Sequence, residues 1–165
     1  MAKNATTVAT FACGCFWSKE YFFSQLPGVV STRVGYTGGQ SSHPTYREVC
    51  TKTTGQAEAV EVHYDPERTD YESLARYFFE IHDPTIDRRG NGGQYRSAIF
   101  YHSQDQQQTA QRLKAELEDM GYRVKTEITA AGPFWEAEQR HQQYCLNKGI
   151  EPRSHYKRRW ARRQI

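Results

Sequence analysis

The sequence predicts an α/β (α+β) fold, a two-layer sandwich in which helices cover mainly one face of a mixed β-sheet. Short β-branched or alternating runs are separated by segments with apolar residues at helical spacing, in the order β-α-β, β-α-β, then a further helix and strand. The 165 residues contain no repeat or low-complexity stretch and fit one compact domain. We therefore expect a single domain over residues 1–165 with a split βαβ, ferredoxin-like core.

The first half of the chain is expected to supply three strands and two helices. Thr7 to Phe11 is short and β-branched and leads directly into the segment CGCFW. Apolar residues then recur at helical spacing up to Pro27-Gly28, so a helix begins at or just after Cys15. In residues 57–64 apolar and polar residues alternate, and Glu58 falls on the same parity as the valines. The expected strands are 7–11, 29–36 and 57–64, and the expected helices are 16–26 and 71–81.

The second half begins with a Gly- and Arg-containing loop over residues 82–93. The clearest helix of the chain follows at residues 104–120, where Leu113, Leu117 and Met120 form a narrow apolar stripe and Gly121 ends the pattern. The other expected elements are a strand at 97–101, a possible edge strand at 124–128 and a last helix at 134–146.

Composition favours a cytoplasmic protein with reduced thiols. The first ten residues lack the apolar run of a secretory signal, and no stretch approaches the roughly 20 apolar residues of a membrane span. In the cytoplasm the four cysteines would be kept reduced, so any disulfide would be transient, which favours redox or nucleophilic chemistry. The six histidines are scattered and no cysteine pair has zinc-site spacing, so no metal is expected.

Basic residues gather at the C-terminal end. The formal net charge is +3, yet six Lys and Arg side chains stand among the last thirteen residues, around Trp160. Such an end can touch nucleic acid, but a short charged terminus is more often a solvated tail. We therefore expect a domain core over about residues 8–146, a solvated tail over 147–165, and no nucleic-acid partner.

Cys15 is the strongest candidate nucleophile. Because it follows a strand and opens a helix, its sulfur would face unpaired backbone N–H groups and the positive end of the helix dipole, which lower a thiol pKa. Phe16 and Trp17 come next and would place an aromatic wall beside the sulfur, suited to a methyl group. On these residues alone, a buried core cysteine among core aromatics is an equal alternative.

Six short segments, in order from about residue 8 to about residue 146, favour the interpretation of Cys15 as a nucleophile over that of a core cysteine. They are Cys13 to Trp17, Val34 to Gly39, Pro44 to Cys50, Gly55 to Glu58, His82 to Thr85 and Gln94 to Ser97. Together they strongly resemble the A-type peptide methionine sulfoxide reductases, for which the GCFW, GYTGG and QYRSAI segments are specific. The resemblance implies an enzyme, a peptide-methionine (S)-S-oxide reductase. Such an enzyme reduces the S epimer of methionine sulfoxide, free or in proteins, and so repairs oxidative damage.

The resemblance also implies roles for single residues. Cys15 would attack the sulfoxide sulfur and become a sulfenic acid, while Phe16 and Trp17 would hold the methyl group. No cofactor is implied, because the sulfenic acid condenses with another thiol and thioredoxin, or alternatively glutaredoxin or glutathione, restores Cys15.

Glu58 would be the acid that protonates or hydrogen-bonds the sulfoxide oxygen, with further hydrogen bonds from the hydroxyls of Tyr46 and Tyr95. A sulfoxide oxygen is a poor leaving group until it is protonated, and an aromatic pocket disfavours a charged carboxylate. Without the family, Glu58 reads more readily as a solvent-facing strand residue.

The chain departs from the family pattern at two places. The family usually carries an Asp just after the Gly-Asn of the loop preceding QYRS, but here Gly90-Asn91 runs directly into Gly92-Gly93. Asp87 or Asn91 could take over its hydrogen bond, and neither is assigned as a site residue. Many members also place a second cysteine in the C-terminal tail, where this chain has Ser154.

Cys145 is the expected recycling thiol. Cys13 is too close to Cys15 for an unstrained bridge, and Cys50, expected at a strand edge, matches a family position without a catalytic role. Cys145 ends the last expected helix just before a flexible tail, so its backbone could move to meet Cys15. Direct attack on the sulfenic acid by an external thiol remains an equal alternative.

Two other functions fit parts of the sequence. Another thiol enzyme on the same scaffold, such as a peroxidase or an acyl-transferring enzyme, would use Cys15 in the same way. A small RNA-binding module could combine a split βαβ sheet with the basic tail, although the strands lack an aromatic-rich run.

Overall fold

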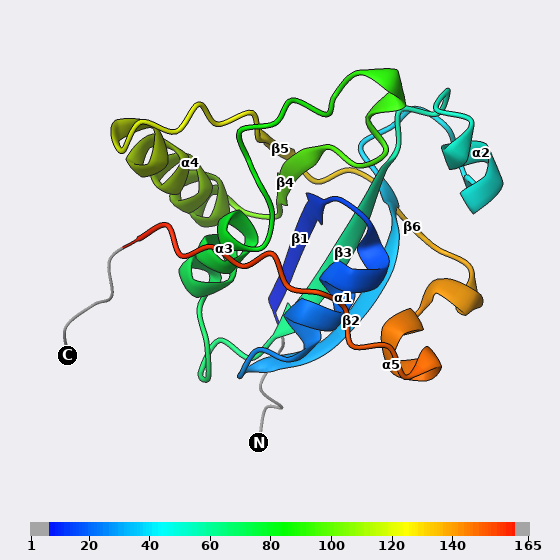
Figure 1. Ribbon diagram of the computed structural model, residues 1–165, viewed down its shortest axis with the longest axis horizontal. Coiled ribbons are helices and arrows are strands. Elements are labelled where there is room, and N and C mark those ends of the chain that lie inside the picture. Colours follow the sequence, from blue (N-terminus) through cyan, green and yellow to red (C-terminus); the bar gives the residue numbers. More distant parts are fainter. Residues whose placement is uncertain (1–6, 161–165) are drawn as a thin grey trace.

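The computed structural model describes residues 7–160 and shows a mixed sheet flanked by helices (Figure 1). The sheet has six strands in the order β5-β4-β1-β3-β2-β6. The strands are β1 (Thr7–Cys13), β2 (Val29–Thr37), β3 (Ala57–Tyr64), β4 (Ser97–Tyr101), β5 (Glu127–Ala130) and β6 (Phe134–Glu136). The α-helices are α1 (Phe16–Ser24), α2 (Tyr46–Cys50), α3 (Tyr71–Glu80), α4 (Gln104–Asp119) and α5 (Tyr144–Lys148). The expected α/β class with a mixed sheet is confirmed, and elements β1 to β4, α1, α3 and α4 lie within two residues of their expected bounds.

Two crossover connections build the centre of the sheet. Helix α1 joins β1 to β2 across β3, and α3 joins β3 to β4 across β1. Strand β1 is antiparallel to both β3 and β4, with Phe11 opposite Val60 and Cys13 opposite Ser97. The end of β1 and the beginnings of β3 and β4 therefore meet at one edge of the sheet. Strand β5 runs parallel to β4 and makes the sheet mixed.

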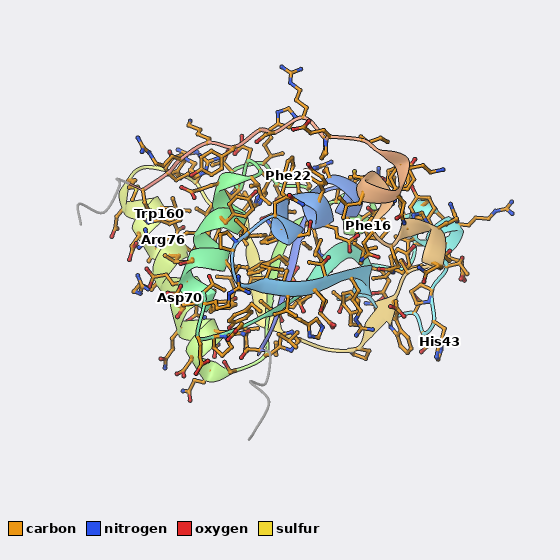
Figure 2. All side chains as sticks on the ribbon, turned by 90° about the horizontal axis from the view of Figure 1, so that it is seen from below. Phe16, Phe22, His43, Asp70, Arg76 and Trp160 are labelled. Atoms are coloured by element: carbon orange, nitrogen blue, oxygen red, sulfur yellow. The ribbon has the colours of Figure 1, made fainter. Side chains whose placement is uncertain are left out.

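The main hydrophobic core lies between the sheet and helices α1 and α3, which share one face of the sheet (Figure 2). Val60 and Val62 of β3 belong to this core, whereas Ala57 and Ala59 belong to a smaller cluster on the other face. Residue parity along a strand decides the face. Glu58 therefore shares the face of the valines, as expected, and is only 2% exposed.

Phe11 joins β1 to both helices that cover it. Its ring stacks on Phe23 of α1 at a centroid distance of 5.1 Å and on Phe78 of α3 at 5.3 Å. Stacked pairs of this kind contribute about 0.5–1.5 kcal/mol each beyond the area they bury. They hold the C-terminal end of α1, and α3, against the sheet.

The last helix expected from the sequence, 134–146, is wrong. Residues 134–136 form β6, which pairs with β2, residues 139–141 form a short 3₁₀ helix, and only Tyr144–Lys148 is α-helical. A Cβ on Gly35 of β2 would lie 2.4 Å from the carbonyl oxygen of Trp135, so β6 can approach only because residue 35 is glycine. Gln143 then adopts a left-handed φ of 48°, which separates α5 from the preceding turn.

Two further expectations need correction. Cys50, expected at the edge of a strand, lies at the end of helix α2, whose Thr45 and Glu48 make a reciprocal capping box. The expected edge strand at 124–128 lies later, at β5, because the N–H of Lys125 donates to the carbonyl of Pro84 instead of a neighbouring strand.

The basic C-terminal segment, expected to be a solvated tail, is exposed over residues 153–158 but is anchored to the domain at residues 159–160. Trp160 is 8% exposed, and its Nε1–H donates to Glu116 of α4 at 2.9 Å. The guanidinium of Arg159 donates to the carbonyls of Phe79 at 2.7 Å and His82 at 3.1 Å. We call residues 153–160 the strap, because they cross α3 as an extended segment (Figure 1). Arg162 and Arg163 lie outside the described residues.

Within residues 7–160, no helix is long and apolar enough to span a membrane.

Candidate active site

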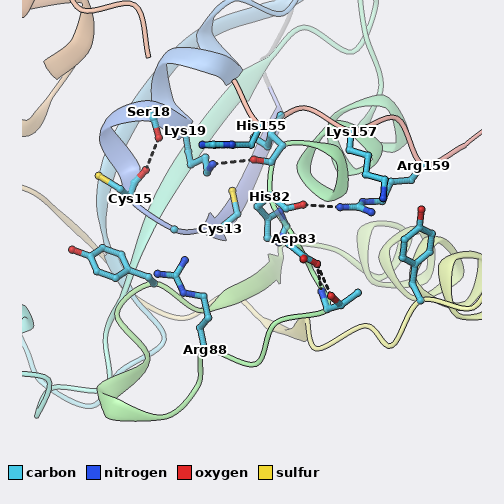
Figure 3. A pocket seen from close by; sticks show the side chains of 15 residues that line it. Cys13, Cys15, Ser18, Lys19, His82, Asp83, Arg88, His155, Lys157 and Arg159 are labelled. Atoms are coloured by element: carbon cyan, nitrogen blue, oxygen red, sulfur yellow. Dashed lines mark hydrogen bonds between the residues drawn. The ribbon is translucent and has the colours of Figure 1, made fainter. Parts of the chain in front are cut away.

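Cys15 lies where β1 gives way to α1, as the sequence predicts. Gly14 turns the chain with a φ of 112°, a conformation that glycine adopts without strain, and Cys15 is the N-cap of the helix. The Cys15 carbonyl accepts a hydrogen bond from the hydroxyl of Ser18 at 3.4 Å (Figure 3). It also accepts one from the backbone N–H of Lys19 at 3.4 Å. The side chain of Cys15 is exposed and its thiol is free.

The expected lowering of the Cys15 pKa is wrong. Loss of hydration among the surrounding atoms raises the pKa of this thiol above its ordinary value, and the negative charge of Glu58 adds to the effect. The backbone N–H groups of Trp17 and Ser18 act in the opposite direction, as expected at a helix start, but they do not prevail. The resting site at neutral pH therefore holds Cys15 as a thiol.

Glu58 is buried directly behind Cys15. Its Oε1 accepts from the N–H of Phe16 at 3.2 Å, and its Oε2 accepts from the side-chain amide of Gln94 at 2.7 Å. Burial raises the pKa of Glu58, although both hydrogen bonds and the charge of Lys52 oppose the shift. Glu58 is therefore not a solvent-facing strand residue. Its carboxyl is hydrogen-bonded to Phe16, the residue that follows the candidate nucleophile.

Tyr46 and Tyr95 approach Glu58 from α2 and from the loop before β4. Burial raises the pKa of both phenols, and the negative charge of Glu58 raises each further. Both hydroxyls therefore remain protonated at neutral pH and can donate hydrogen bonds. Tyr46 is positioned by Glu138, whose Oε2 accepts from its backbone N–H at 2.9 Å.

Phe16 and Trp17 form part of a larger aromatic wall. Phe16 is 1% exposed, and its ring lies 5.7 Å from Tyr36 and 6.5 Å from Tyr46, measured between centroids. Trp17 is half-buried and stacks on Tyr144 of α5 at 3.8 Å. Phe16 and Trp17 thus belong to an aromatic cluster that follows Cys15 in the chain, and their contact with a methyl group stays a prediction.

His141 is part of the site and was missed by sequence reasoning. Its ring is fully buried, and its Nδ1 accepts from the indole N–H of Trp17 at 2.9 Å. It also packs against Tyr46 at a centroid distance of 4.5 Å. Burial lowers the pKa of His141, so the neutral ring orients Trp17 and Tyr46. Only the fold brings residue 141 to residue 17, so no local pattern could have shown this contact. Gln94 was also missed, although its QYRS segment was noted.

The other cysteines differ in their surroundings. Cys145 is 5% exposed in α5, and its thiol donates to the carbonyl of Trp17 at 3.4 Å. Burial raises the pKa of Cys13 to about 12, so it stays a thiol. Cys50 ends helix α2 and not a strand edge, and its sulfur accepts from the Gln94 amide at 3.6 Å. All four cysteines, including Cys15, are unpaired thiols.

The structure shows the two places where the chain departs from the family pattern, the loop before QYRS and the tail position of Ser154. Asp87 is exposed and forms an ion pair with Arg89 at 2.7 Å, and Asn91 is exposed in the same loop. Ser154 is exposed on the strap, where its hydroxyl accepts from the N–H of Tyr156 at 3.1 Å. In residues 7–160, no three His, Cys, Asp or Glu side chains lie close enough together to hold a metal ion.

The geometry thus combines a thiol, a buried carboxyl, two phenols and an aromatic wall at one edge of the sheet. Residues 7–165 match the sequence model of the family described as peptide methionine sulfoxide reductase. The chain belongs to this family. Relatives named peptide methionine sulfoxide reductase MsrA include one from Nocardia farcinica, 50% identical over 93% of this chain and 91% of its own. Another from Geobacter metallireducens is 51% identical over 86% of this chain and 91% of its own.

Solved structures of the family share the fold. Reduced Mxr1 from Saccharomyces cerevisiae superposes with a TM-score of 0.85 at 30% identity, covering 96% of this chain and 95% of its own. Methionine sulfoxide reductase A of Corynebacterium diphtheriae superposes with a TM-score of 0.79 at 38% identity, covering 93% of this chain and 80% of its own. Membership of the peptide methionine sulfoxide reductase family therefore rests on sequence and fold together.

Proposed function

We propose that this chain reduces the S epimer of methionine sulfoxide, free or in proteins, to methionine, with Cys15 as the nucleophile. One observation carries the proposal: the buried Glu58 carboxyl accepts the N–H of Phe16 at 3.2 Å, which holds it beside Cys15. A nucleophilic sulfur and a protonatable carboxyl at this spacing suit the attack on a sulfoxide.

The reaction balances without a cofactor. Cys15 and Glu58 share one proton, which passes from the Cys15 thiol to Glu58. The resulting thiolate attacks the sulfoxide sulfur while Glu58 delivers that proton to the sulfoxide oxygen. The sulfur–oxygen bond breaks, and the oxygen passes to Cys15 as a sulfenic acid, which leaves methionine as the thioether. The raised pKa of Glu58 favours its protonated form, and the hydroxyls of Tyr46 and Tyr95 can donate to the same oxygen.

The aromatic wall supplies the selectivity for the methyl group. The half-buried indole of Trp17 offers an apolar surface beside the sulfur, with the buried ring of Phe16 in the core, and the hydrogen bond from Trp17 to His141 fixes the indole. With the oxygen directed to Glu58 and the methyl to this wall, one configuration at sulfur is favoured.

The sulfenic acid must then be reduced, and we propose Cys145 as the recycling thiol with thioredoxin as the dithiol donor. The Cys145 thiol already contacts the carbonyl of Trp17, two residues from Cys15. Condensation forms a Cys15–Cys145 disulfide and water, and thioredoxin reduces the disulfide by exchange. The yeast protein Mxr1 has been crystallised in complex with Trx2.

The decisive experiment supplies each purified epimer of methionine sulfoxide with dithiothreitol and measures methionine. Turnover of the S epimer alone is expected, and the folded Cys15→Ser variant should show none. Equal turnover of both epimers would contradict the epimer assignment. Faster turnover of hydrogen peroxide or a thioester would favour another thiol enzyme.

A further inference from the structure

A cavity opens on Cys15 from the side of the strap. Its volume is about 670 Å³, Cys15 lies at one end of it (Figure 3), and Tyr95 is also among the lining residues. Glu58, Phe16 and Trp17 do not line it. A molecule in this cleft therefore meets Cys15 without occupying the place of the methyl group or of the carboxyl.

The strap builds one wall of the cleft with alternate residues. His155, Lys157 and Arg159 line the cavity, whereas Arg158 does not. This alternation is expected of an extended segment. The backbone N–H of Lys157 donates to the carbonyl of Glu80 at 2.8 Å, which holds the wall against α3.

The charge of the cleft is strongly one-sided. Four cationic side chains line it, and they are Lys19, Arg88, Lys157 and Arg159. Asp83 is the only carboxylate among the lining residues that the structure describes. Burial lowers the pKa of His82 to about 3, so its ring is neutral. An anionic ligand would be attracted here.

Two of these cations stand beside the nucleophile. A Cβ placed on Gly14 would lie 3.6 Å from Nη1 of Arg88 and 3.7 Å from Cε of Lys19. In the described part of the chain, neither side chain has a carboxylate within ion-pair distance, since the ion pairs found there involve other residues. The ammonium of Lys19 is buried and donates to the carbonyl of Ile81 at 2.9 Å, so Lys19 adds positive charge from behind the cleft. The guanidinium of Arg88 is exposed and is therefore available to a ligand.

We propose that this cleft binds a small thiol carrying carboxylates, and that this thiol reduces the Cys15 sulfenic acid directly. The carboxylates would lie against Lys157 and Arg88, with the buried charge of Lys19 adding to the attraction, and an ammonium group of the same molecule would suit Asp83. The inference rests on the proposed function, since that reaction forms the sulfenic acid. It provides a route for electrons that does not require Cys145.

The route has two balanced steps. The bound thiol attacks the Cys15 sulfur, the sulfur–oxygen bond breaks, and a mixed disulfide and water form. A second thiol molecule attacks the mixed disulfide, which restores the Cys15 thiol and releases the small-molecule disulfide. Two thiols are oxidised for each sulfenic acid reduced.

The test compares two charge reversals on the strap. Lys157→Glu places a carboxylate in the cleft, and Arg158→Glu makes the same change in net charge at an exposed neighbour outside it. Both are made in a Cys145→Ser chain, so that no intramolecular disulfide competes. After oxidation by one equivalent of methionine sulfoxide, the rate of Cys15 reduction is measured with glutathione, its diethyl ester and dithiothreitol.

Lys157→Glu is expected to lower the rate constant for glutathione about tenfold, while Arg158→Glu changes it less than about twofold. The ester and dithiothreitol, which lack the carboxylates, should reduce all variants at similar rates. Mass spectrometry should find glutathione on Cys15. Equal losses in both variants, or equal losses with glutathione and its ester, would overturn the proposal. Lys157→Gln, with a smaller expected loss, serves if the reversal does not fold.

Failure of the proposed function would look different. If methionine sulfoxide left Cys15 unoxidised in every variant, that reaction would be wrong. Hydrogen peroxide would then form the sulfenic acid, and the same comparison of thiols would still decide the role of the cleft.

Discussion

At the scale of single residues, loss of hydration outweighs hydrogen bonding at the site. Glu58 accepts two hydrogen bonds and Cys15 faces two backbone N–H groups, yet the pKa of each is raised. Sequence reasoning identified both residues and the burial of Glu58. It could not give the direction of the Cys15 shift, because that direction depends on atoms packed around the sulfur from other segments.

Replacing Glu58 by Gln should slow the chemical step about a hundredfold to ten-thousandfold, the usual contribution of a positioned general acid. The amide can still hydrogen-bond the oxygen but gives up no proton. Single-turnover measurement of methionine formation tests this. A rate within about threefold of the unmodified chain would remove Glu58 from the mechanism.

The pH dependence follows from the same two groups. Below the raised pKa of Glu58 both groups are protonated and no thiolate is available, and above the raised pKa of Cys15 no proton is available for the oxygen. The kcat/KM profile should therefore be a bell whose limbs belong to the coupled pair. In Glu58→Gln the limb that belongs to Glu58 should disappear. The rate should then rise with increasing pH, as the Cys15 thiolate forms, and level off above the pKa of Cys15. An unchanged bell in that variant would contradict the pairing.

At the scale of elements, sequence patterns predicted what local residues determine. The alternation in residues 57–64 and the helical spacing in residues 104–120 gave elements close to those observed. The expected helix at 134–146 failed because pairing with β2 overrides helical spacing there. Helix α2 could have been predicted from the Thr45 and Glu48 capping box.

Helix α5 holds the proposed recycling thiol. After one equivalent of methionine sulfoxide without reductant, a Cys15–Cys145 peptide should be found by mass spectrometry, because Cys145 contacts the carbonyl of Trp17. Unmodified Cys145 beside a stable sulfenic acid, or a bridge from Cys15 to Cys13 or Cys50, would show that α5 does not supply the thiol.

The strap depends on its terminal anchor. Trp160→Ala should lower the free energy of unfolding by about 1–3 kcal/mol, because it removes a buried indole and its hydrogen bond to Glu116. It should also raise the KM for glutathione more than that for dithiothreitol, since the wall of the cleft loosens. Urea denaturation and thiol titrations provide the two readouts, and Arg158→Ala on the same segment is the control.

At the scale of the whole molecule, the site is assembled where the end of β1 meets the beginnings of β3 and β4. The site residues were predicted from the resemblance to the family, whereas the strand pairing that brings them together was not predicted. The strap, His141 and the basic cleft could not be predicted, because each depends on contacts between segments distant in the sequence.

Phe11 tests how far the sheet and its helices form one cooperative unit. Phe11→Ala should cost about 3–5 kcal/mol, because a fully buried ring that stacks on both α1 and α3 is lost. Circular dichroism and Trp fluorescence should still report a single coincident transition. Separate transitions would show that α1 and α3 unfold independently.

The strap also has a consequence for the order of events during synthesis. Arg159 contacts residues about eighty positions earlier in the chain, whereas Cys15, Glu58 and Tyr95 all precede the end of β4 at residue 101. A chain emerging from the ribosome can thus bring its reactive thiol, carboxyl and phenol together before the cationic wall exists. For that interval Cys15 would meet oxidants and thiols without the charge selection that the finished protein imposes.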